Sequence, residues 1–115
     1  MSHRVLSFKY AFEGIAAAFK EEPNLKFHFV AAALVILAGL YFQITHTEWL
    51  VLILTIGLVL TLELTNAAIE AVVDSFTDKV HPGAKLAKDV AAGAVLTGAI
   101  TATAIGLIIF LPYLS

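Results

Sequence analysis

The sequence predicts an all-α integral membrane protein because it is rich in apolar residues, contains three long apolar stretches and concentrates its positive charge in two places. Of its 115 residues, 60% are hydrophobic and 14% are charged, whereas a soluble domain has about 45–50% apolar and about 25% charged residues. A membrane-spanning helix needs roughly 20 mostly apolar residues. We therefore expect a single domain over 1–115, with transmembrane helices at about 26–44, 48–74 and 84–111.

The segment 1–22 differs from the three spans because its apolar and charged residues are mixed. Phe8 and Phe12 alternate with Lys9 and Glu13, which fits a helix that lies in the membrane surface with its aromatic rings down. A helix packed on the bundle as in a soluble protein is the alternative. We expect no signal peptide, which would have a compact apolar core and a small-residue cleavage site.

The positive residues predict the orientation of the spans. Lysine and arginine occur before the first span and around the second link, 75–83. Both the first link, 43–48, and the C-terminal tail lack them. Cytoplasmic loops carry the excess of Lys and Arg. We therefore expect a cytoplasmic N-terminus and second link, with the first link and the C-terminus outside.

The composition also excludes several functions. With no cysteine in the chain, a disulfide framework, a thiolate metal site and a cysteine nucleophile are excluded. The net charge of −2 gives no basic surface for a nucleic acid, so we expect no nucleic-acid partner.

Polar residues at the inner end of the second span form the most informative pattern of the sequence. Glu63, Asn66, Glu70 and Asp74 fall within an arc of about 80° and extend for about 16 Å along one helix face. An acid at the centre of a membrane helix costs about 3 kcal/mol on insertion scales. Oxygen ligands suit a hard cation such as Mg²⁺, so this acidic stripe predicts a metal site.

Two other interpretations of the acidic stripe remain open. Its members could form structural ion pairs or reach toward the lipid headgroups. A small proton-coupled transporter also uses an intramembrane Glu, although isolated acids near the bilayer midplane are then expected.

Further polar residues are expected at the same membrane face. Lys85, Lys88 and Asp89 share one helix face, where lysines would bind phosphate oxygens or only satisfy the topology. For His28 we favour a packing role over partnership with a carboxylate. A role for His81 near phosphates is only weakly indicated.

Two segments carry a resemblance to a known family. The run ELTNAAIEAVVD and the later HPGAKLAKDVAAGAVL resemble the small bacterial integral-membrane lipid kinases, the prokaryotic diacylglycerol kinase family. The resemblance covers nearly the whole chain, including SFKYAFEGI and the acidic pair before Pro23. It implies a homotrimer in the bacterial cell membrane, with composite active sites at the cytoplasmic face that use ATP and Mg²⁺.

The resemblance also implies roles for individual residues. The family's catalytic base falls on Glu63, and its metal-binding glutamates fall on Glu22 and Glu70. Its ATP-binding positions fall on Tyr10, Glu22, Asn66, Glu70, Asp74, His81, Lys88 and Asp89. The expected reaction is phosphorylation of the hydroxyl of a membrane lipid.

The lipid is indicated by the branch of the family that the chain is most similar to. SFKYAFEGI and EPNLKFH look like the Gram-positive branch, whose members phosphorylate undecaprenol. The enterobacterial branch, which uses diacylglycerol, has an acid where His28 stands and a small hydroxyl residue where Ala92 stands. Undecaprenol is therefore the expected substrate, with diacylglycerol as the alternative.

Overall fold

The computed structural model describes residues 3–77, 79 and 81–115, and within these residues it consists of four helices. They are α1 (His3–Glu21), α2 (Pro23–Phe42), α3 (His46–Phe76) and α4 (Pro82–Leu114). The start of the expected surface helix and positions 78 and 80 of the expected second link lie outside the described residues. By length and composition, α2, α3 and α4 could each cross a membrane, which confirms the prediction of three apolar spans.

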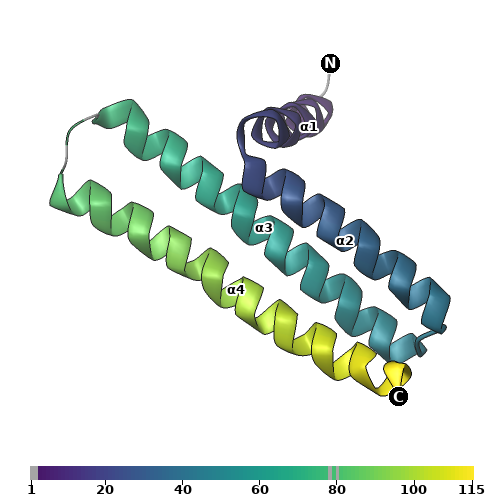
Figure 1. Ribbon diagram of the computed structural model, residues 1–115. Helices are drawn as coiled ribbons and strands as arrows, with labels where there is room; N and C mark the ends of the chain where they lie inside the picture. The colour runs from purple at the N-terminus through teal and green to yellow at the C-terminus, as the bar shows by residue number, and fades with distance from the viewer. Residues whose placement is uncertain (1–2, 78, 80) are drawn as a thin grey trace.

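The three long helices lie side by side, and α1 lies at an angle to them beside the start of α2 (Figure 1). Helix α3 packs against both α2 and α4, most extensively against α4. The radius of gyration is 17.1 Å, compared with about 13 Å for a compact domain of about 100 residues. The chain is therefore an open layer of helices rather than a globule.

Prolines determine where two of the helices begin. Pro23 and Pro82 occupy the first positions of α2 and α4, so both helices start earlier than the expected positions 26 and 84. Proline suits this position because the first helical N–H groups have no partner within the helix. At the other end, α4 continues through Pro112 to Leu114, beyond the expected end at 111.

The short link between α2 and α3 is fixed by backbone geometry and capping. Gln43 ends α2 in the left-handed conformation, with φ of 54°. The Thr45 hydroxyl accepts a hydrogen bond from the Glu48 amide, while the Glu48 carboxylate accepts one from the Thr45 amide. This reciprocal pair is a capping box, which satisfies two donors at the start of a helix.

A small core ties the helices together at the end of the bundle that holds this link. Ile44, Leu52 and Ile109 are buried there, with Trp49 and Tyr113 packed against them. The Tyr113 hydroxyl also donates a hydrogen bond to the Glu48 carboxylate. The end of α4 is thereby attached to the start of α3.

Elsewhere the helices present large apolar side chains on their surfaces. On α1, Phe8 and Phe12 are 68% and 70% exposed. A chain with so much apolar surface requires a non-aqueous environment or further protein to cover it. A lipid bilayer would provide that environment for α2, α3 and α4, which are long and apolar enough to cross it.

Candidate active site

The four polar residues of the acidic stripe differ in how deeply they are buried. Glu63 is 5% exposed, Asn66 and Glu70 are half-buried, and the Asp74 side chain is 62% exposed. The stripe therefore runs from the interior of the bundle to its surface along α3. This gradient places one acid among apolar neighbours and the others within reach of a water-soluble ligand.

A groove between α1 and α3 is lined by Glu70 and Asp74 of the stripe, and we call it the acidic groove. It has a volume of about 520 Å³, within the range of about 300–1,000 Å³ that is usual for ligand pockets. Its charged and aromatic lining residues are Tyr10, Glu21, Glu22, Glu70 and Asp74. Apolar residues of both helices, most of them small, form the rest of the lining, namely Ala11, Gly14, Ile15, Ala17, Ala18, Leu64, Ala67, Ala68 and Ala71.

Glu22 stands between α1 and α2, at the N-cap position of α2. Its side chain makes no capping hydrogen bond, so the carboxylate is available for a ligand. Burial raises the pKa of Glu22 above its ordinary value, and repulsion from Glu70, Glu63 and Glu21 raises it further. Electrostatic repulsion of this kind is relieved when a cation binds among the carboxylates.

The donor set of the acidic groove fits a magnesium ion that is shared with a phosphate ligand. The Asn66 side-chain amide donates a hydrogen bond of 3.2 Å to one Glu70 oxygen, and the buried Asn66 Oδ1 has no partner among the described residues. Within residues 3–77, 79 and 81–115, no three His, Cys, Asp or Glu side chains are grouped to hold a metal by themselves. Mg²⁺ is commonly bound by only one or two carboxylates, with water and substrate phosphates as the other ligands.

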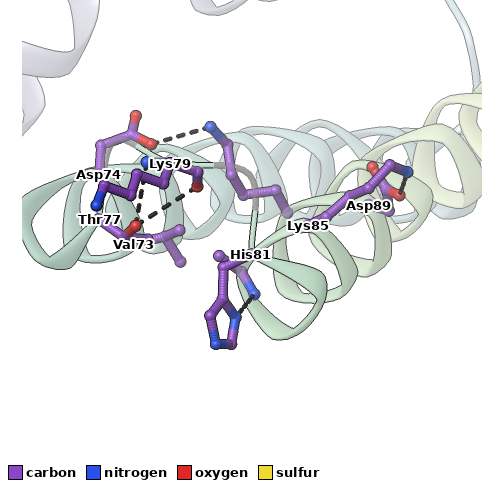
Figure 2. A pocket seen from close by; sticks show the side chains of 9 residues that line it. Val73, Asp74, Thr77, Lys79, His81, Lys85 and Asp89 are labelled. Atoms are coloured by element: carbon purple, nitrogen blue, oxygen red, sulfur yellow. Dashed lines mark hydrogen bonds and ion pairs between the residues drawn. The ribbon is translucent and has the colours of Figure 1, made fainter.

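A second hollow lies where α3 and α4 approach their link, and we call it the basic hollow (Figure 2). It has a volume of about 360 Å³, and Lys79, Lys85 and Lys88 line it. Lys88 forms an ion pair of 2.9 Å with Asp74, and Lys85 forms one of 2.5 Å with Asp89.

His81 lies at the start of α4, on the edge of the basic hollow (Figure 2). Its Nδ1 accepts hydrogen bonds from the amides of Gly83 and Ala84. His81 is therefore the N-cap of α4, and it positions a helix N-terminus, which favours anions, beside the three lysines.

The residues that the sequence predicted for ATP divide between these two hollows. Tyr10, Glu22 and Glu70 line the acidic groove, while His81, Lys88 and Asp89 line the basic hollow. Asp74 lines both, and its ion pair with Lys88 connects them. Asn66 and Glu63 line neither hollow.

Glu63 lies deeper in the bundle and has a partner on another helix. His28 Nε2 of α2 lies 2.8 Å from Glu63 Oε1, although the sequence favoured a packing role for this histidine. Sequence reasoning also used Lys79 only as a topology signal, whereas the structure places it in the basic hollow. The signal available in the sequence was that Lys79 lies a few residues before Lys85 and Lys88, just ahead of the helix start at Pro82.

The fold and the site define a class: a small helical membrane enzyme whose acidic and basic side chains gather near one end of the bundle. Residues 9–110 match the family model described as prokaryotic diacylglycerol kinase. The chain therefore belongs to the prokaryotic diacylglycerol kinase family, and it is a bacterial membrane protein and a lipid kinase.

Individual relatives carry two different names. The chain is 47% identical to an undecaprenol kinase from Bacillus subtilis, over 94% of this chain and 88% of that protein. It is 41% identical to a diacylglycerol kinase from Synechocystis, over 94% of this chain and 62% of the relative. With a diacylglycerol kinase from Escherichia coli it shares 32% identity, over 81% of this chain and 76% of the other.

Proposed function

We propose that this lipid kinase transfers the γ-phosphate of ATP to the hydroxyl group of undecaprenol in a reaction that depends on Mg²⁺. One observation carries the chemistry: Glu63 is 5% exposed within a membrane-spanning helix, about 10 Å along that helix from Glu70. This spacing suits a base that meets a lipid hydroxyl below a nucleotide at the membrane surface. Similarity to the Bacillus relative named undecaprenol kinase supports the choice of lipid.

The proposed reaction assigns the proton to Glu63. The O–H bond of the lipid alcohol breaks and its proton moves to a Glu63 carboxylate oxygen, while the lipid oxygen bonds to the γ-phosphorus. The bond from the γ-phosphorus to the oxygen that bridges it to the β-phosphate breaks, and ADP leaves. Phosphoryl transfer depends mainly on positioning and charge neutralisation, and a general base typically contributes about 10²–10⁴-fold.

Glu22 and Glu70 are the proposed metal ligands, and Asn66 holds the Glu70 carboxylate through its amide. When bound, Mg²⁺ supplies neutralisation of the phosphate charge. Tyr10 and Asp74 line the acidic groove around the nucleotide. Lys88, Asp89 and His81 approach its phosphates from the basic hollow, where Lys88 offsets developing negative charge.

We propose further that the active enzyme is a homotrimer with composite sites. The exposed apolar side chains of α1 to α4 support association, because surfaces of this kind are covered by lipid or by protein. We also propose that the N-terminus and both hollows face the cytoplasm, and that the C-terminus is outside. The lysines around the α3–α4 link support this orientation.

Purified enzyme in lipid nanodiscs, supplied with γ-labelled ATP, tests the substrate. Undecaprenol and diacylglycerol are offered in parallel at equal mole fraction. We expect labelled phosphate on undecaprenol at several times the rate on diacylglycerol. Preference for diacylglycerol would overturn the proposed lipid, and label on neither would overturn the proposed reaction.

A magnesium titration tests the metal ligands. Glu70→Ala should raise the Mg²⁺ concentration needed for half-maximal activity, because one carboxylate ligand is lost. Glu13→Ala is the matched control, since Glu13 is an exposed acid of α1 whose only ion pair among the described residues is a 4.0 Å contact with Lys9. A Glu70→Ala titration curve identical to that of Glu13→Ala would contradict the metal-binding role.

A further inference from the structure

The contact between His28 and Glu63 joins two spans inside the apolar part of the bundle. Nε2 and Oε1 are 2.8 Å apart, and the side chains are 18% and 5% exposed. The two atoms lack the alignment of a hydrogen bond, and Glu63 Oε1 accepts none from the described residues. A carboxylate oxygen and an imidazole nitrogen remain this close only when a proton lies on one of them, because two lone pairs would repel.

Of the other cationic groups near this end of the bundle, Lys26 of α2 lies over the Phe19 ring and two lysines of α4 are paired with acids. Lys88 pairs with Asp74 and Lys85 pairs with Asp89. On α4, residues 90–112 include no charged or titratable side chain. In the part of the chain that the structure describes, His28 is the basic group that lies within ion-pair distance of Glu63.

Glu63 is also one of three acids that repel the Glu22 carboxylate. Glu22, at the junction of α1 and α2, is repelled by Glu63 and by Glu70 of α3. Glu21 at the end of α1 adds to the same repulsion at Glu22. None of these acids supplies a positive charge to Glu63, whereas His28 lies 2.8 Å from it.

A carboxylate that is buried without compensation takes up a proton. A protonated Glu63 could not accept the proton of an alcohol. We propose that His28 is a positioning residue that keeps Glu63 ionised and fixes the direction of its carboxylate toward the lipid hydroxyl. This inference rests on the proposed role of Glu63 as the base, and His28 itself does not touch the reacting atoms.

Kinetics of three variants test the proposal. His28→Leu removes the proton and the contact, whereas His28→Gln keeps an N–H donor but cannot carry a positive charge. Thr55→Val is the matched control, because Thr55 is a buried polar residue on the same face of α3 whose hydroxyl bonds only to the Val51 carbonyl among the described residues. Each variant is assayed for kcat and for the KM of ATP across a range of pH.

We expect His28→Leu to lower kcat at neutral pH by at least about tenfold, with the KM of ATP unchanged. Activity should recover as the pH rises, so the acid limb of the profile moves upward by about one to three pH units, the usual effect of losing a nearby opposite charge. His28→Gln should show the same shift, which keeps the test open where His28→Leu does not fold. A loss that is equal at every pH, or a profile that coincides with that of Thr55→Val, would overturn the proposal.

Infrared spectroscopy of the substrate-free protein provides a test that does not depend on activity. His28→Leu at neutral pH should show a protonated-carboxyl band that wild type lacks. The band should be absent from the double variant His28→Leu/Glu63→Gln, which assigns it to Glu63. The absence of this band in His28→Leu would overturn the inference. This result can be read even if the wild-type enzyme phosphorylates neither lipid, an outcome that would overturn the proposed function.

Discussion

Gly98 lies where α4 approaches α3 closely, next to the helix turn that carries the proposed base. Gly98 is buried, and a Cβ atom added there would lie 2.6 Å from Leu62 Cδ1. Leu62 directly precedes Glu63 in the chain. Gly98→Ala therefore tests whether the packing of α4 sets the position of Glu63.

The expected size of the effect follows from two opposing contributions. Alanine is up to about 1 kcal/mol more favourable than glycine within a helix, whereas an extra methyl group in a packed interface costs about 1–3 kcal/mol. We expect Gly98→Ala to lower the free energy of unfolding by about 1 kcal/mol. At Gly93 and Gly106, an added Cβ has no neighbouring heavy atom within 4 Å, so alanine should increase stability by about 0.5–1 kcal/mol at these positions.

Reversible unfolding in mixed micelles measures these differences, with kcat and the KM of ATP determined on the same samples. If the clash shifts the backbone of Leu62 and not only the end of its side chain, Glu63 should move and kcat should fall without a change in the KM of ATP, because a misplacement of about 1 Å can cost about 10²-fold in rate. Gly93→Ala and Gly106→Ala should retain the wild-type kcat. If Gly98→Ala matched them in stability and in kcat, the close approach of α4 to Leu62 would have no energetic consequence and the reasoning would be refuted.

Three further predictions concern charge and orientation. Lys88→Met should lower kcat by about 10²–10³-fold, and Lys85→Met should lower kcat by much less. Steady-state assays with saturating lipid would measure both effects. Because burial and repulsion from neighbouring acids hold the pKa of Glu22 above its ordinary value of 4.5, the folded state binds more protons than the unfolded state, and stability falls as the pH rises above that value. Without Mg²⁺, Glu22→Gln should therefore melt at a higher temperature than wild type at neutral pH, with the difference disappearing in acid, and equal melting temperatures at neutral pH would contradict this. Since the chain has no cysteine, an impermeant maleimide should label Ser115→Cys in intact cells and Ser7→Cys only after permeabilisation, and the opposite pattern would reverse the topology.

The helical architecture was predictable because local chemistry determines it. Three apolar stretches of span length favour helices in lipid, where every backbone group must be hydrogen-bonded internally. The helix starts at Pro23 and Pro82 also follow a local preference, although the sequence-based boundaries fell two to three residues inside them. The stripe from Glu63 to Asp74 could likewise be placed on one face because it depends only on helical periodicity.

Contacts between helices were less predictable because they depend on how each helix is rotated against its neighbour. The contact of His28 with Glu63 requires a particular rotation of α2 relative to α3, which no local pattern specifies. The division of the expected ATP residues between two hollows that share Asp74 likewise follows from the placement of α1 and the pairing of α3 with α4. The lysine at position 79 was missed for a related reason, since its place in the basic hollow depends on the link between two helices.

The most direct test of the account is a comparison of Glu63→Gln with wild type in the presence of Mg²⁺, ATP and undecaprenol. The substitution removes a single negative charge and preserves the size of the side chain, so ATP binding, measured by calorimetry, should be unchanged. Transfer of phosphate to the lipid should fall by at least about 10²-fold, the lower limit for loss of a general base. Transfer at the wild-type rate would show that the buried acid of α3 is not the base and would contradict the account.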